Sequence, residues 1–160
     1  MWIALIGAAL AVAPGKLAGT WTYAGGAAEE QQRDAMVDRT AATFNFALRG
    51  FARSKLRKVA VLDQRLIISG DESSLRFVFQ GENNRETVGP SDGSPFEVRG
   101  AKVRFELVPD SSIVVTGETG DGGKRSTYTL TSADTLRVDY KVWSGMLSAP
   151  MTWSLTYQRR

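Results

Sequence analysis

The chain has 160 residues, with 20 Lys and Arg, 17 Asp and Glu, 16 Gly and a net charge of +3, and it contains no His and no Cys. A chain of this length suffices for one domain with a core of its own. Without Cys there are no disulfides, thiol nucleophiles or thiolate metal sites, and without His the commonest general base and metal ligand is missing. We therefore expect neither an enzyme nor a metal or cofactor site.

The chain begins with a mainly apolar stretch that has no charge before Lys16. Thirteen such residues are too few to cross a bilayer, which takes about 20, but they match the apolar part of a secretory signal. We expect residues 1–16 to be a signal peptide and short leader, and the product to be periplasmic or secreted. The alternative is a first strand or buried helix of the mature fold. Residues 17–160 then form a single domain.

A short strand at Leu17–Tyr23 and a helical segment are predicted next. Apolar residues recur every three to five positions over residues 27–56, which predicts a helix that Gly50 kinks or divides. Residues 28–58 hold seven basic and four acidic side chains, and the rest of the chain holds thirteen of each. The basic excess lies at the helix end, where the helix dipole favours it. With no basic stripe elsewhere, we expect no nucleic-acid partner.

From Val59 onward the apolar pattern has a period of two, interrupted by turn sequences such as GDES, GENN and GDGGK. Such short links join neighbouring strands antiparallel, and closure removes the exposed edges of a large sheet. The sequence predicts a mainly β protein, an up-and-down antiparallel barrel of about 8 to 10 strands with a helical insertion between the first and second strands. The later strands are predicted at Arg65–Gly70, Ser74–Gln80, Arg85–Val88, Phe96–Arg99, Lys102–Val108, Ile113–Glu118, Arg125–Thr131, Thr135–Trp143 and Met151–Arg159.

The alternation also predicts what the barrel contains, because apolar and polar side chains separate cleanly on four of the strands. An interior built from the apolar face has almost no charge, so a bound anion has no fixed partner there unless one comes from a strand end. A barrel of about eight strands has room either for one small ligand or for packed side chains, and both alternatives stay open. The residues expected to line a ligand cavity are Phe77, Phe105, Tyr140, Trp153 and Tyr157.

The tripeptide GTW at Gly19, Thr20 and Trp21 stands at the start of the first strand. It resembles the G-x-W signature of the calycins, the group that includes lipocalins and fatty-acid-binding proteins. In lipocalins this Trp lies across the closed end of the barrel, covered by an Arg of the last strand. Arg159 has the inward parity of Tyr157, so the resemblance implies that the Arg159 guanidinium stacks on Trp21 in a structural contact.

A helical segment between the first two strands resembles the fatty-acid-binding protein branch, in which helices form a lid over the ligand entrance. This likeness implies a lid role for Phe44 and Phe51. The ending WSLTYQR resembles that branch's final R-x-Y, whose Arg and Tyr hold a carboxylate, but Leu155 stands in place of the Arg and leaves only Tyr157. An export leader, in turn, is ordinary among lipocalins. The resemblance therefore extends to the larger group and not to one branch.

These features predict an exported, lipocalin-like protein that binds or sequesters a small apolar or weakly polar ligand inside the barrel. A second hypothesis is a non-enzymatic module of an envelope or membrane surface, with a filled barrel core. It rests on the basic helix end, where a weak contact with anionic lipid is expected through Arg49, Arg53, Lys55, Arg57 and Lys58. The alternative for this segment is a solvated helix end whose apolar face packs on the barrel.

Overall fold

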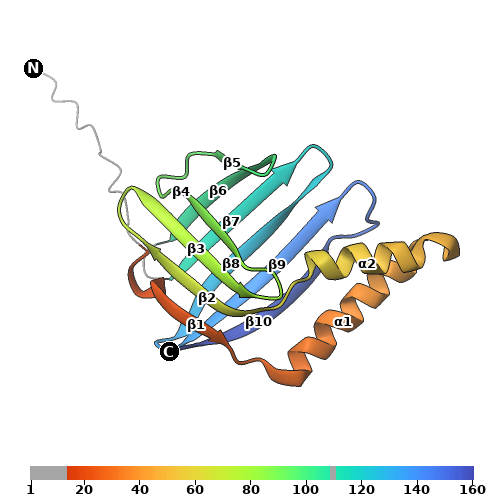
Figure 1. Ribbon diagram of the computed structural model, residues 1–160, viewed down its shortest axis with the longest axis horizontal. Coiled ribbons are helices and arrows are strands. Elements are labelled where there is room, and N and C mark those ends of the chain that lie inside the picture. The colour runs from red at the N-terminus through yellow and green to blue at the C-terminus, as the bar shows by residue number, and fades with distance from the viewer. Residues whose placement is uncertain (1–13, 109–110) are drawn as a thin grey trace, which may run out of the picture.

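The computed structural model describes residues 14–108 and 111–160. Ten antiparallel strands form one sheet in the order β4-β3-β2-β1-β10-β9-β8-β7-β6-β5, which curls into a nearly closed barrel (Figure 1). The first and last strands of this order, β4 and β5, meet where the ring of Phe96 packs over Gly89. The predicted barrel is thus confirmed. Its strands are β1 Gly19–Tyr23, β2 Asp63–Gly70, β3 Ser74–Gly81, β4 Arg85–Pro90, β5 Phe96–Val98, β6 Ala101–Val108, β7 Ser112–Thr119, β8 Gly122–Ser132, β9 Thr135–Ser144 and β10 Met151–Arg159.

The insertion between β1 and β2 consists of two helices, α1 (Gly26–Ala42) and α2 (Arg49–Val59), with a short 3-10 helix at Phe46–Leu48 before α2. The helical segment predicted over residues 27–56 is therefore divided into two helices, and the break between them lies before Gly50 and not at it. Asn45 causes it, because its side chain accepts a hydrogen bond from the Leu48 N–H (3.1 Å) and so begins the second helical segment.

Both helices lie at one end of the barrel and project beyond the strands (Figure 1). α1 packs along β10, and α2 packs against α1. Met36 and Val37 of α1 and Leu56 of α2 are buried in the same apolar core as the barrel interior. No helix within the described ranges is long and apolar enough to cross a membrane.

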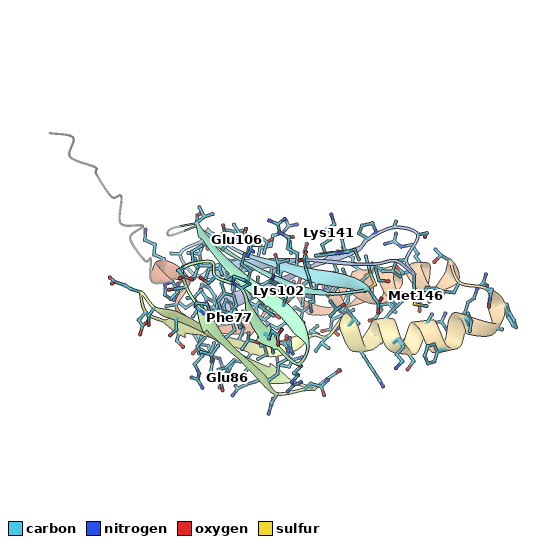
Figure 2. All side chains as sticks on the ribbon, turned by 90° about the horizontal axis from the view of Figure 1, so that it is seen from above. Phe77, Glu86, Lys102, Glu106, Lys141 and Met146 are labelled. Carbon is cyan, nitrogen blue, oxygen red and sulfur yellow. The ribbon has the colours of Figure 1, made fainter. Side chains whose placement is uncertain are left out.

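Side chains alternate between the inside and the outside of the barrel as predicted. Phe77 is 1% exposed and lies between the walls of the barrel, whereas Glu86 and Lys141 lie on its outer sides (Figure 2). Phe77 contacts Phe105 and Tyr128, with ring centroids 5.5 and 5.0 Å apart. These aromatic contacts form the centre of the core.

The closed end of the barrel is built around Trp21, which is completely buried. Its indole N–H donates to the Leu17 carbonyl (3.0 Å), in the short 3-10 helix Gly15–Leu17 that precedes β1. The Arg159 guanidinium lies 4.2 Å from the Trp21 ring centroid, which is the contact that the sequence predicts. Arg159 also donates to the Lys16 carbonyl, so Lys16 packs on the barrel. The remainder of the expected leader, residues 1–13, lies outside the described residues.

Candidate functional site

The open end of the barrel carries two adjoining pockets, which share Val59 of α2 and Lys124 of β8. We call them the cationic pocket and the apolar pocket, and together the mouth site. The cationic pocket has a volume of about 530 Å³, and its charged lining residues are Lys58, Arg85, Arg99, Lys124 and Glu82. The apolar pocket has a volume of about 360 Å³ and includes Ala101, Gly117, Gly123, Val142 and Trp143. The mouth therefore combines an excess of positive charge with an adjacent apolar surface.

One ion pair inside the mouth is fully formed. Asp63 is only 2% exposed and accepts two hydrogen bonds from the Arg85 guanidinium, at 2.7 and 2.8 Å. The same guanidinium lies 4.1 Å from the centroid of the Phe79 ring. A bidentate pair of this kind fixes both side chains, and its desolvation is offset by two charge-assisted hydrogen bonds. The pair leaves little net charge of its own.

Lys124 differs from Arg85 because its charge has no such partner. Its side chain lies on the inward face of β8, with the ammonium nitrogen 4.9 Å from the Tyr140 ring centroid and 5.5 Å from that of Trp153. Among residues 14–108 and 111–160, no carboxylate lies within ion-pair distance of it. Burial and the nearby Arg85 lower the pKa of Lys124 to about 8, although Asp63 acts in the opposite direction. At neutral pH this ammonium is thus charged, partly desolvated and stabilised mainly by aromatic faces.

The aromatic side chains around Lys124 carry hydrogen-bond donors. The indole N–H of Trp153 is buried and has no acceptor in the described part of the chain. Burial raises the pKa of Tyr140 and of Tyr157, so both hydroxyls keep their protons at any ordinary pH. A buried donor without a partner is costly, and an anionic oxygen at this position would relieve that cost.

The structure brings all five predicted cavity residues into the interior, in two groups. Phe77 and Phe105 lie together deep in the barrel, and Tyr140 and Trp153 stack near the mouth with ring centroids 4.8 Å apart. Tyr157 is hydrogen bonded to Tyr140 and joins the second group. Their contact with a ligand stays a prediction.

The two residues predicted to act in a lid are placed differently from each other. Phe44 is partly buried after the end of α1. Phe51 lies on α2 with 63% of its surface exposed, so most of its ring does not pack on the barrel. A gating role for either residue stays a prediction.

Sequence reasoning did not identify Asp63, Arg85 and Lys124 as site residues, and it expected an interior with almost no charge. The charges come from strand ends, the one source that the prediction had left open. Lys124 belongs to β8 because that strand begins at Gly122, three residues before the predicted start at Arg125. Arg85 is the cross-strand partner of the inward-facing Phe79. A prediction of this pairing would have placed Arg85 on the inner face, because cross-strand partners share one face of a sheet. Asp63 had no such signal, because an irregularity in the β2–β3 register after it changes the alternation.

Comparison with known proteins identifies the fold. No protein-family model matches the chain, and no curated protein matches it. Among solved structures, a mutant of the fluorescent protein UnaG is 15% identical, with a TM-score of 0.56 over 91% of this chain and 96% of that one. A Schistosoma mansoni fatty acid binding protein in complex with arachidonic acid is 14% identical, with a TM-score of 0.57 over 91% and 97% of the two chains. The chain therefore has a calycin-like fold, as predicted, and the solved structures that it resembles favour the fatty-acid-binding-protein-like form, a branch on which the sequence had not decided.

Proposed function

We propose that the protein binds a small amphiphilic anion at the mouth of its barrel, in a non-enzymatic role. The observation that carries the proposal is Lys124, an inward-facing ammonium without a carboxylate partner in the described part of the chain. A bound carboxylate or similar head group would supply the missing countercharge. The interior residues alone had suggested an apolar or weakly polar ligand, and the charges at the mouth favour an anion instead.

Each part of the mouth site has a role in this proposal. The head group accepts from Lys124, which lines both pockets of the mouth site. The indole N–H of Trp153, whose ring lies beside Lys124 and which has no acceptor among the described residues, is a second donor that a ligand reaching the interior could use. Arg85 is neutralised by Asp63, so the rest of the positive potential comes from Lys58 and Arg99. The apolar part of the ligand contacts Val142 and the other walls of the apolar pocket, and extends toward the aromatic residues predicted to line the interior. A ligand with both parts fits a site in which the cationic and apolar surfaces adjoin.

Competition binding tests this proposal. A fluorescently labelled fatty acid serves as the reporter, and laurate and dodecanol, which share one chain length, serve as competitors. We expect laurate to displace the reporter about tenfold more effectively than dodecanol, because only laurate gains a charge-assisted contact. Lys124→Met should abolish this difference. Lys102→Met, which removes an exposed ammonium from the outer wall, should leave it intact. Equal displacement by both competitors, or no displaceable binding, would contradict the proposal.

A second candidate function is docking of the helical insertion on an anionic membrane surface. Phe46 and Phe51 are 88% and 63% exposed, and Leu48 between them is 47% exposed. They share the segment with the basic residues at the helix end, so apolar and cationic groups are both accessible to solvent.

Co-sedimentation with vesicles distinguishes this second function. We expect binding to phosphatidylglycerol vesicles but not to phosphatidylcholine vesicles, and loss of binding when Arg53, Lys55 and Arg57 are all replaced by Ala. Phe46→Ser should weaken binding without changing its dependence on salt. Sedimentation that is the same for the triple Ala variant and the original protein would exclude the membrane contact.

We also propose that the protein acts after export, to a periplasm or to the outside of the cell. The uncharged, apolar sequence before Lys16 supports this. Mass spectrometry of the protein recovered from the exported fraction should find a mature N-terminus near residue 14. Recovery of the full-length chain from the cytoplasm alone would contradict export.

A further inference from the structure

A second concave surface lies on the outer wall of the barrel. α1 runs beside β10 and stands over the outer faces of β8, β9 and β10, which leaves a groove of about 890 Å³. We call it the outer groove. Its volume is typical of sites for small organic molecules. Its lining side chains are mostly polar, and those used below are Glu29, Arg39, Arg125, Asp139, Lys141 and Thr152.

The outer groove has an excess of positive charge that the protein does not neutralise. Both carboxylates that line it are already occupied, Glu29 by Thr156 and Asp139 by Arg137 and by the Ser154 hydroxyl. No ion pair involves Arg39, Arg125 or Lys141 among the residues that the structure describes.

Arg125 and Lys141 are also direct cross-strand partners of β8 and β9. Two like charges at directly opposed positions of a sheet repel each other, and neither of these two forms an ion pair within the described part of the chain. An anion bound between them would convert this repulsion into attraction.

Glu29 already shows how a carboxylate sits on this edge of the sheet. Its two oxygens accept hydrogen bonds from the backbone N–H (2.8 Å) and the hydroxyl (2.6 Å) of Thr156 in β10. β1 pairs with Tyr157–Arg159 and the Ala24 N–H donates to the Thr156 carbonyl. Among the described residues, no strand pairs with the part of β10 before Thr156 on this side, so the edge is open there. The absence of a side chain at Gly25 gives the Glu29 carboxylate its room, since a Cβ there would collide with one of its oxygens.

Thr152 repeats the donor pair of Thr156 four residues earlier along the same edge, beyond Ser154, whose hydroxyl already donates to Asp139. In a strand, residues separated by an even number of positions direct their N–H groups to the same side and their side chains to the same face. Thr152 therefore presents an N–H and a hydroxyl to the groove, as Thr156 does. In the register of the sheet, Thr152 is opposite Lys141, which is itself opposite Arg125.

We propose that the outer groove binds a small organic anion with two or three carboxylate groups. One carboxylate sits on the N–H and hydroxyl of Thr152, in the way that Glu29 sits on Thr156, and a second lies between Arg125 and Lys141. Arg39 faces them from α1. The Glu29 contact favours carboxylates over phosphates, because it places two coplanar oxygens on two neighbouring donors. The groove shares no lining residue with the two pockets of the mouth site.

Titration with citrate at low ionic strength, followed by NMR of the backbone amides, tests the proposal. We expect saturable shifts centred on the amides of Thr152 and Ser154. Arg125→Gln combined with Lys141→Gln should weaken citrate binding by about tenfold or more. Lys102→Gln combined with Arg104→Gln is the matched control, because it removes two cations of the same outer wall outside the groove.

A third variant, Thr152→Val, removes only the hydroxyl and should weaken citrate binding without a change in folding. Three results would overturn the proposal. Equal weakening by both double variants would indicate attraction by net charge alone, and amide shifts centred away from Thr152 would place the anion elsewhere. Tighter binding of pyrophosphate than of citrate would exclude the carboxylate assignment.

Discussion

The guanidinium of Arg159 covers the indole ring of Trp21, with 4.2 Å between the guanidinium carbon and the ring centroid. The same guanidinium donates to the Ala18 carbonyl (2.8 Å) and to the Lys16 carbonyl. One side chain of the last strand thus joins the first strand to the segment before it. The Trp of the calycin-like G-x-W sequence, together with Arg159, therefore closes one end of the barrel.

Loss of this contact should destabilise the barrel without affecting the mouth. We expect Arg159→Met to lower the free energy of unfolding by about 2 to 3 kcal/mol, from the cation–π contact and the hydrogen bonds to carbonyls together. Urea denaturation measures the change. The neighbouring Arg160→Met is the control and should change stability very little, because its side chain is exposed. Equal effects of the two substitutions would show that the stacked contact contributes nothing.

Gly19 should be required for the same contact. A Cβ at this position would lie 2.6 Å from a guanidinium nitrogen of Arg159, and the backbone φ of +143° disfavours any side chain. We expect Gly19→Ala to destabilise the protein by about 1 to 3 kcal/mol. In the double variant Gly19→Ala with Arg159→Ala, the loss of stability should be smaller than the sum of the losses in the two single variants. Full additivity would mean that the steric conflict with Arg159 is absent.

Asp63 and Lys124 should have opposite effects on stability and binding. Asp63→Asn leaves Arg85 without its partner, so we expect a loss of about 3 kcal/mol in the free energy of unfolding together with tighter laurate binding. Glu82→Gln is the control, because it removes an exposed carboxylate of the same pocket and should tighten binding slightly at no cost in stability. If the Asp63→Asn variant is folded but binds laurate more weakly than the original protein, positive charge at the mouth does not attract the ligand and the proposal is contradicted.

Lys124→Met should make the protein more stable while it abolishes preference for an anion. It replaces a desolvated ammonium without a carboxylate partner among the described residues by an apolar side chain of similar length, which is expected to stabilise by about 1 to 2 kcal/mol. Thermal unfolding and laurate binding, measured on one sample, check both parts. A decrease in stability with unchanged binding would make Lys124 a structural residue.

The pH dependence of stability follows from the same group. The pKa of Lys124 is about 8 in the folded protein and 10.5 in an unperturbed lysine, so the unfolded chain binds more protons between these values. The free energy of unfolding should therefore rise with pH from about 8 to 10. It should fall above pH 10, because burial raises the pKa of Tyr140 and unfolding then releases a proton. In Lys124→Met the rise should be missing; a rise of equal size would assign it to another group.

The barrel was predictable because the alternation of apolar side chains reports directly on burial. Phe77, Phe105 and Leu155 have the strict period of two that a half-buried strand requires, and all three are inside. The closed end was predictable for a different reason. The resemblance of GTW to the calycin signature implied an Arg of the last strand over Trp21, and Arg159 has the inward parity that this contact requires.

The mouth site and the outer groove were not predictable from those patterns. Arg85 and Lys124 are charged residues near strand ends. Without the strand boundaries, the sequence pattern predicts turn or surface positions for both. Arg39 and Arg125 are far apart in the sequence, and only the path of α1 along β10 brings them to one groove. Asn45 likewise divides the helical insertion through a local side-chain contact that the apolar period does not reveal.

NMR titration of the Lys124 ammonium, with and without saturating laurate, tests the central claim most directly. In the free protein the pKa should be about 8. If the head group of an amphiphilic anion binds beside Lys124, the added negative charge should raise this pKa well above its value in the free protein. A Lys124 pKa that stays at its free value while laurate is demonstrably bound would place the head group elsewhere and contradict the account.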